Sequence, residues 1–323
     1  KIQIILKYRN KNHVIWNVKQ EEIMMKYKII SDGCCDLHKE IIEQYQLDVI
    51  PFYISFDEEH YDKEIEEIGI REVYERMVKE PTVYPKTSLP SVQNYIDAFL
   101  PYVEQNIPVI CMCFTPSLSG SYNSACNAEE IIREDYPDAK ISIINTEAAT
   151  VSQGLMVIEA GRMWEQGIPY EQCVDILEKM KKTNRIFFTV GSVDYLKHGG
   201  RIGKLAGLAS SALALKPLIT LVDGSIEASG IGRSRKKTVQ KTVDLLNGYF
   251  KETGESMQDY RFAVGFGYDV EEGKKFREEV EKDIQSQAGE KEVSLIQIGA
   301  TIAVHTGPYA IGVGIIKQYE HFL

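Results

Sequence analysis

Several small hydroxyl residues stand together where an apolar run passes into a helix-like segment. In TPSLSGSYNSA (115–125), Ser117, Ser119 and Gly120 follow the apolar run and precede the helix-like residues. The free N–H groups and the dipole of a helix N-terminus attract an anion, and a hydroxyl adds one more donor. An ordinary N-cap explains the same residues equally well. This segment alone therefore indicates either an anion-binding loop or a capped helix.

A second segment has the same design. In PKTSLPSVQ (85–93), Thr87 and Ser88 precede a Pro-Ser pair that is typical of a helix start. The third candidate is His305, which we expect at the end of a strand where a Gly-Pro pair forces a turn. An imidazole there can donate to an anion, although an ordinary turn residue is the more common case. Two such hydroxyl segments could share one anion.

Two basic clusters interrupt the acidic chain, KHGGRIGK (197–204) and GRSRKK (232–237). Charge runs are usually solvated faces. Their glycine-rich setting raises the alternative that Arg201 and either Arg233 or Arg235 meet an acidic partner or a nucleotide phosphate. These three arginines are therefore the candidates for contact with a partner.

Motifs for nucleotide binding and ester hydrolysis are incomplete. A P-loop needs G-x-x-x-x-G-K-[ST], but the nearest match has His198 at the first glycine and Leu205 after the lysine. The nucleophile elbow G-x-S-x-G fails because Ser117 takes its first position. No pattern predicts a metal or a cofactor. A hydrolase that uses Ser119 and His305 is the alternative function, since a Ser and a His in one pocket can act as nucleophile and base.

Short apolar runs alternate with helix-like segments from Tyr27 onward, which is typical of βαβ units around a largely parallel sheet. The second half has more closely spaced strands, which predicts a mixed sheet. We therefore predict an α/β fold with two domains. The predicted strands are 27–33, 47–56, 108–114, 140–146, 185–192, 217–230 (as a hairpin), 259–267, 291–307 and 310–316. The predicted division is an extension at 1–26, an N-terminal domain at 27–170 and a C-terminal domain at 171–323.

Length, charge and cysteine usage limit the function further. A chain of 323 residues exceeds one typical core, which favours two domains. The net charge of −10 argues against a nucleic-acid partner, which needs a broad basic face. The six cysteines form no C-x-x-C pair, and we expect a reducing cytoplasm. No apolar run approaches the roughly 18–20 residues of a membrane span.

Six segments together resemble one known family. The order and approximate spacing of the DegV family of bacterial fatty-acid-binding proteins are matched by SDGCCDL, PKTSLPSVQ, LSGSYNSA, YLKHGGRIG, KPLITLVDG and IGATIAVHTGP. The resemblance covers about Tyr27 to Lys317. It implies that two α/β domains enclose a long acyl chain in a tunnel, and that Thr87, Ser119 and His305 hold its carboxylate.

The same resemblance implies a role beside an enzyme. The loaded protein would present its carboxylate to a separate ATP-binding kinase subunit, which makes acyl phosphate for phospholipid synthesis. Two positions depart from the family pattern: Gly33 stands where Ser is usual, and Tyr309 where Gly is usual. The first changes a loop hydroxyl, whereas the second places a phenol near the expected head-group site.

An apolar tunnel needs an apolar lining. The candidates are residues 205–219 and the helix faces near Ile158 and Met163. Plain core is the more common role for most such positions.

Overall fold

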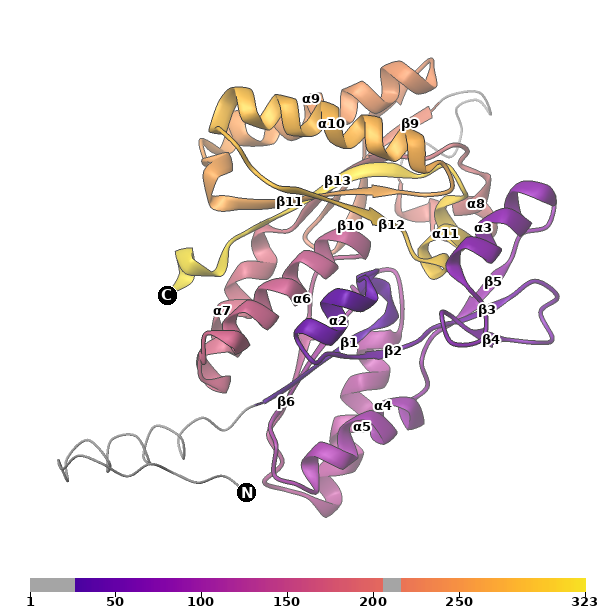
Figure 1. Cartoon of the computed structure of the whole chain (residues 1–323). Coiled ribbons are helices and arrows are strands. Elements are labelled where there is room, and N and C mark those ends of the chain that lie inside the picture. Colours follow the sequence, from indigo (N-terminus) through magenta and orange to yellow (C-terminus); the bar gives the residue numbers. More distant parts are fainter. Residues whose placement is uncertain (1–26, 206–215) are drawn as a thin grey trace, which may run out of the picture.

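The computed structural model describes residues 27–205 and 216–323 (Figure 1). Its first part contains a parallel sheet of four strands in the order β2-β1-β6-β7. These strands are β1 (Lys28–Asp32), β2 (Asp48–Ile50), β6 (Val109–Cys113) and β7 (Ile141–Asn145). The prediction of a parallel sheet in the first half is therefore confirmed.

Helices cover both faces of this sheet, because successive side chains of a strand point to opposite faces. On one face Cys111 packs with α4 (Val92–Val103) and α5 (Ser121–Asp135). On the other face Met112 packs with α6 (Thr150–Glu165). The other helices of this half are α2 (Lys39–Gln44), α3 (Ile70–Lys79) and α7 (Tyr170–Met180).

The prediction of one strand over 47–56 is wrong. The chain breaks at Pro51, between β2 and β3 (Tyr53–Ser55). Proline has no N–H to donate to a strand ladder, so it ends the pairing there. Beyond it, β3 pairs antiparallel with β4 (Asp62–Lys63) and β5 (Lys86–Ser88) in a separate three-stranded sheet.

The second part contains a mixed six-stranded sheet in the order β10-β9-β8-β13-β11-β12, in which only β11 and β12 pair in parallel. The predicted hairpin is β9–β10, and its turn residues Asp223 and Gly224 have φ values of 47° and 76°. A type I′ turn requires such positive φ values. The strands are β8 (Arg185–Thr189), β9 (Lys216–Val222), β10 (Ser225–Gly232), β11 (Tyr260–Phe266), β12 (Val293–Gln297) and β13 (Ile311–Lys317).

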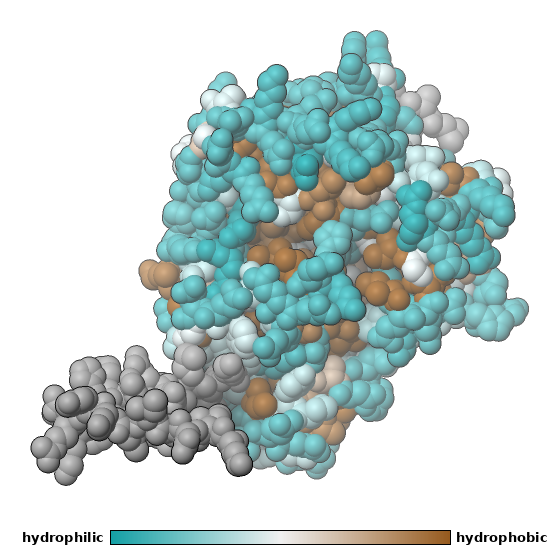
Figure 2. All heavy atoms as spheres, viewed as in Figure 1, coloured by the Kyte–Doolittle hydropathy of each residue, from teal (hydrophilic) through white to brown (hydrophobic). Residues whose placement is uncertain are grey.

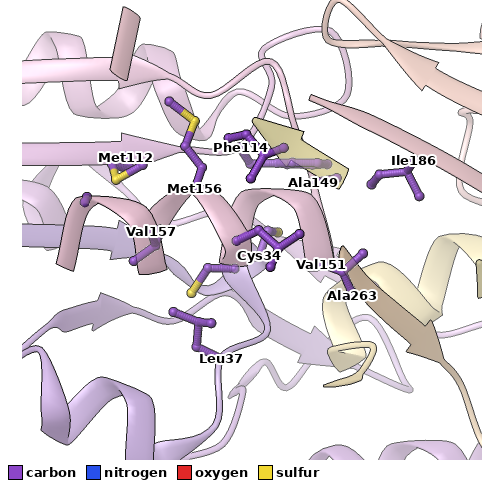
Figure 3. Close-up of a cluster of buried hydrophobic side chains, with 14 of the residues drawn as sticks. Cys34, Leu37, Met112, Phe114, Ala149, Val151, Met156, Val157, Ile186 and Ala263 are labelled. Atoms are coloured by element: carbon purple, nitrogen blue, oxygen red, sulfur yellow. The ribbon is translucent and has the colours of Figure 1, made fainter. Parts of the chain in front are cut away.

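The buried helix α6 joins the two parts. It packs on β11 and β13, while α9 (Arg235–Thr253) and α10 (Val270–Ala288) cover the opposite face of the six-stranded sheet (Figure 1). Glycines let α6 approach closely: a methyl group at Gly265 or Gly314 would lie 3.0 or 2.6 Å from the Val151 side chain. Figure 3 shows Val151 among buried side chains from both parts.

The segment 291–307, predicted as one strand, contains β12 and then a short helix, α11 (Ala300–Thr306). A buried apolar run does not by itself distinguish strand from helix. Glu64 stabilises the helical conformation here, because its carboxylate accepts hydrogen bonds from the first two N–H groups of the helix. His305 therefore lies on a helix and not at a strand end.

All strands of the parallel sheet precede residue 146, and all strands of the six-stranded sheet follow residue 184. The division near 170 stays a prediction, and the predicted extension at 1–26 lies outside the described residues.

Figure 2 shows a mainly polar surface, with apolar side chains gathered in the band between the α9–α10 layer and the part that holds α4 and α5. The remaining short helices of the described residues are α8 (Asp194–His198) and the 3-10 turns Gly33–Cys35, Lys181–Thr183, Ile202–Lys204, Met257–Asp259 and Tyr319–Phe322.

No helix within 27–205 or 216–323 combines the length and the apolar character that crossing a membrane requires.

Candidate functional site

A cavity lies where the two parts of the molecule meet. It contains ≈ 990 Å³ of atom-free space, part of which is open to solvent. Most of its wall is apolar and comes from the six-stranded sheet, from α6 and α11, and from loops that follow strands of the parallel sheet. Such a wall suits an alkyl chain better than a charged ligand. Large apolar side chains in the wall include Phe52, Phe114, Ile186, Phe188, Leu221 and Ile302.

Three of the predicted ligand-binding residues line this cavity, although they come from distant segments. Thr87 lies on β5, Ser119 on the loop after β6, and His305 on α11. The Thr87 hydroxyl lies 3.0 Å from Nε2 of His305. Gly199 adjoins the imidazole, and a methyl group there would overlap its Nδ1. The ring is therefore held between a hydroxyl and a glycine backbone.

The imidazole of His305 is neutral. Burial, together with the charges of Arg201 and Lys86, lowers the pKa of His305 to about 3. Its Nδ1 is buried and has no hydrogen-bond partner in the described part of the chain. Because an unpaired buried N–H is rarer than an unpaired acceptor, we place the proton on Nε2, which then donates to Thr87. The Thr87 hydroxyl proton is left to donate into the cavity.

The Ser119 hydroxyl is oriented by its own loop. It accepts a hydrogen bond from the N–H of Ser121 at 3.2 Å, so its proton remains available to a ligand. The Ser121 hydroxyl donates in turn to the buried carboxylate of Asp32 at 2.7 Å. Arg201 holds the residue before Ser119, because its Nη2 donates to the carbonyl of Leu118 at 2.9 Å.

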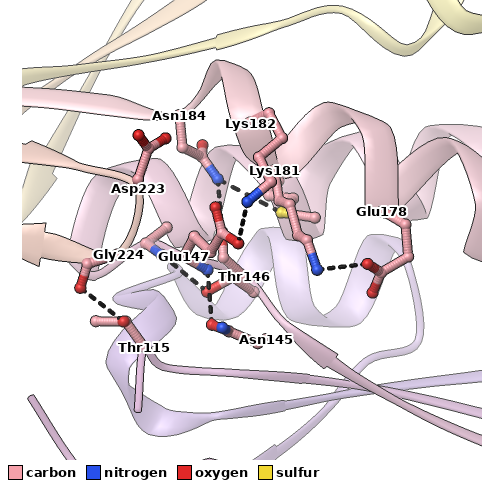
Figure 4. A network of polar contacts seen from close by, with 12 residues as sticks. Thr115, Asn145, Thr146, Glu147, Glu178, Lys181, Lys182, Asn184, Asp223 and Gly224 are labelled. Carbon is pink, nitrogen blue, oxygen red and sulfur yellow. Dashed lines mark hydrogen bonds and ion pairs between the residues drawn. The ribbon is translucent and has the colours of Figure 1, made fainter. Parts of the chain in front are cut away.

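The β9–β10 turn braces the same loop. The hydroxyl of Thr115 donates to the carbonyl of Gly224 at 2.7 Å, and the Ser117 hydroxyl donates to the same oxygen. Figure 4 shows the first contact beside a polar network that includes Glu147 and Lys182. Ser117 therefore ties the loop to the six-stranded sheet and does not cap a helix.

Comparison with known families identifies the chain. The family model described as "Uncharacterised protein, DegV family" matches residues 26–318. This chain belongs to the DegV family. A DegV domain-containing protein of Clostridium perfringens is 31% identical over 302 residues, which are 92% of this chain and 100% of the relative.

Several solved DegV-type structures share the fold. A stearic acid-binding protein from Eubacterium ventriosum is 45% identical, has a TM-score of 0.85, and is matched over 91% of this chain and 99% of its own. A DegV family protein from Thermus thermophilus, described by its fatty acid binding, is 26% identical with a TM-score of 0.79 over 90% and 99% of the two chains. DegV from Bacillus subtilis, a fatty acid binding protein, is 25% identical with a TM-score of 0.77 over 91% and 100%.

Two other predicted residues lie beside the DegV cavity without lining it. Within the described chain neither Ser88 nor Gly120 forms part of its wall; Ser88 is exposed, and Gly120 is the N-cap of α5. The predicted helix start at the Pro-Ser pair is confirmed, and Thr87 and Ser88 lie before it on β5. The N-cap of α4 is Ser91, whose hydroxyl accepts from the N–H of Asn94 at 3.2 Å, and two hydroxyls before it belong to a strand.

The three predicted partner arginines have different surroundings. Arg201 lines the cavity, and burial lowers the pKa of its guanidinium. Arg235 forms a two-point ion pair with Glu272 at 2.8 and 2.7 Å, so most of its charge is already compensated. Arg233 is exposed. Contact with a partner stays a prediction for all three.

The residues predicted to line the tunnel or to lie near its head-group site have different positions in the structure. Residues 206–215 lie outside the described residues, and Met163 is fully buried in the core around α6. Tyr309 is 41% exposed and its ring stands edge-on to that of Tyr268, at 6.4 Å between centroids. In the described structure Tyr309 does not line the cavity, so its phenol leaves the wall unchanged.

Sequence reasoning missed several buried polar residues around the cavity. Asp32 accepts from Ser121 and from the N–H of Phe114, and its position at the C-terminal end of the first strand of an α/β fold was a usable signal. Thr150 and Thr301 line the cavity with no sequence pattern to mark them. No group of three or more His, Cys, Asp or Glu side chains in 27–205 and 216–323 is arranged to hold a metal ion.

Proposed function

We propose that this protein binds a long-chain fatty acid, with the alkyl chain in the cavity and the carboxylate held by Thr87, Ser119 and His305. The observation that carries the proposal is the meeting of these three residues, from three distant segments, at one apolar cavity. The fatty acids bound by the related DegV structures from Eubacterium ventriosum and Thermus thermophilus support the ligand class.

The proposed head-group site relies on neutral donors. The hydroxyl protons of Thr87 and Ser119 are both free to reach a carboxylate oxygen, and the imidazole of His305 supports Thr87 from behind. Arg201 contributes a positive charge in the same wall. Each charge-assisted hydrogen bond to the carboxylate contributes about 1.5–3 kcal/mol to the binding free energy.

The alkyl chain supplies most of the affinity in this proposal. At ~0.8 kcal/mol per buried methylene, a chain of about 15 methylenes contributes roughly 12 kcal/mol before the costs of binding. The carboxylate contacts then fix the direction of the ligand in the cavity.

We further propose that the loaded protein presents its carboxylate to a separate ATP-dependent kinase subunit, which forms an acyl phosphate for phospholipid synthesis. In this role the chain is a carrier and not an enzyme, and we expect it in the cytoplasm. The alternative, a hydrolase, gains no support from the geometry. His305 contacts Thr87 and not Ser119, and among the described residues no acid orients its Nδ1.

Lipid extraction and native mass spectrometry of the purified protein test the proposal. We expect a co-purified mass that matches a fatty acid, and Ser119→Ala should weaken rebinding of stearate after delipidation. Ser88→Ala is the matched control, because Ser88 is a neighbouring hydroxyl outside the cavity. Absence of any bound lipid, together with no stearate binding after delipidation, would refute the proposed function. Turnover of p-nitrophenyl esters that Ser119→Ala abolishes would favour the hydrolase.

A further inference from the structure

A second group of polar side chains lies in the cavity wall. Thr150, at the start of α6, and Thr301, on α11, both line the cavity. Behind them two buried carboxyl groups meet at Gly299. A methyl group at Gly299 would lie 2.9 Å from a Glu64 oxygen and 3.2 Å from the carboxyl carbon of Asp36, so the two carboxyl groups are near neighbours.

The two carboxyl groups differ in their hydrogen bonds. Glu64 accepts from the N–H groups of Ala300 and Thr301 and from the Thr301 hydroxyl, at 2.5, 3.4 and 2.5 Å. Asp36 faces the Thr150 hydroxyl, but neither of its oxygens has a partner at hydrogen-bond geometry in the described structure. Burial, together with the nearby charge of Glu64, raises the pKa of Asp36 to about 8. Asp36 is therefore a neutral acid at pH 7.

Thr150 is the least satisfied hydroxyl of this group. The residue is only 8% exposed, and its Oγ1 faces Asp36 without reaching hydrogen-bond geometry to any described residue. Its φ of 41° is rare for a β-branched residue. A buried hydroxyl without a partner calls for an explanation, such as a ligand that the site is built to take. Thr301 donates to Glu64 and keeps capacity to accept one more hydrogen bond.

We propose that Thr150 and Thr301 bind an oxygen atom carried by the acyl chain, so that the ligands of this protein include hydroxylated fatty acids. This inference rests on the proposed function, because the same cavity must hold the chain. A ligand hydroxyl can accept from Thr150 and donate to Thr301, whereas an unsubstituted chain covers Thr150 with methylenes and leaves its hydroxyl unpaired.

The position of the hydroxyl follows from α11. Thr301 precedes His305 by four residues, which places it about 6 Å away along the helix axis. Because the carboxylate is assigned to the His305 end, we expect the preferred hydroxyl in the half of the chain that is nearer the carboxylate.

Competition binding with stearate and with 3-, 5-, 7- and 12-hydroxystearate tests the inference. We expect at least one isomer to bind roughly 3- to 10-fold more tightly than stearate, the gain of one hydrogen bond. Thr150→Val keeps the shape and removes the hydroxyl, so it should abolish this preference and leave stearate binding in place. Thr306→Val is the matched control: Thr306 also lines the cavity, but its hydroxyl already donates to the Ile302 carbonyl at 3.0 Å.

The possible results distinguish failure of this inference from failure of the proposed function. Stearate binding with no isomer preferred would overturn the inference while leaving the proposed function intact, and so would a preference that survives Thr150→Val. Failure of stearate itself to bind would overturn the proposed function and this inference with it. If Thr150→Val does not fold, a crystal structure of the wild-type protein with the preferred isomer replaces it. The ligand oxygen must then lie within hydrogen-bond distance of Thr150 Oγ1.

Discussion

Replacing Gly199 by alanine tests the proposed head-group geometry most directly. An alanine Cβ would lie less than 3.0 Å from Nδ1 of His305 and 3.2 Å from Cε1, where ordinary contacts begin at 3.4 Å. The backbone itself accepts alanine, because Gly199 has a helical φ of −75°. The ring must therefore move, and because Thr87 lies on its other side it must swing sideways, which breaks the aligned 3.0 Å contact with Thr87.

The expected loss is that of one head-group hydrogen bond. Without Nε2 behind it, the Thr87 hydroxyl is free to turn away from the carboxylate. A charge-assisted hydrogen bond contributes about 1.5–3 kcal/mol, so the Kd for stearate should rise roughly 10- to 150-fold. The larger contribution of the buried alkyl chain is unaffected, so binding should weaken without disappearing.

Isothermal titration calorimetry with two ligands separates head-group effects from tail effects. Stearate carries the carboxylate, whereas octadecan-1-ol has a chain of the same length without it. We expect Gly199→Ala to weaken stearate and to leave octadecanol nearly unchanged. Gly203→Ala is the matched control, because a methyl group there would meet nothing within 4 Å.

Two results would refute this reasoning. Wild-type affinity of Gly199→Ala for stearate, with a correctly folded protein by thermal unfolding, would mean that His305 does not support the carboxylate site. Equal losses for stearate and octadecanol would mean that the substitution deforms the apolar cavity instead.

Three further predictions concern the head group, the partner and the buried acid. Ser119→Ala should weaken stearate binding by calorimetry yet retain measurable affinity; complete loss in a folded variant would show that the tail contributes less than argued here. The isolated protein with ATP, Mg²⁺ and fatty acid should make no acyl phosphate in a radiolabelled phosphate assay until a kinase subunit is added. Arg233→Ala should then lower that activity more than stearate binding, whereas Arg201→Ala should lower both because Arg201 holds the Ser119 loop. The folded pKa of Asp36 is about 8, above its ordinary value of 3.8, so the folded state binds a proton that the unfolded state lacks between these pH values. The unfolding free energy should fall by at most about 1.4 kcal/mol per pH unit as pH rises from 6.5 to 8, and urea titrations of Asp36→Asn should show a flatter dependence.

The three residues that meet at the cavity were candidates from local patterns. Ser119 lies in the loop that follows a buried strand of a parallel sheet, which is where such sheets place ligand-binding loops. Thr87 was marked by the helix start that follows it and His305 by the turn after it, and family resemblance then assigned all three to one carboxylate. Their surroundings were not predictable from local sequence, because Glu64 contacts the start of α11 over 236 residues of chain, and Gly199 touches a ring more than a hundred residues away.

Two errors in element type have different origins. The run that contains His305 is buried throughout, so it has no periodicity to distinguish a helix from a strand. The carboxylate of Glu64, which is distant in sequence, stabilises the helix by accepting a hydrogen bond from its first N–H group. At Pro51 the sequence itself indicated the break, because a proline inside a predicted strand argues against continuous pairing. The proline outweighs the apolar pattern around it.

The placement of Arg201 bears on how the carboxylate would be used. Three of its five N–H donors already serve the carbonyls of Leu118 and Gly199. A guanidinium occupied in this way keeps only two N–H groups for a ligand, fewer than a free arginine offers. The proposed site then holds the ligand mainly through two hydroxyls, each of which donates a single proton. A carboxylate held so lightly keeps lone pairs free to attack a phosphoryl group, which is what a protein that delivers its ligand to a kinase requires.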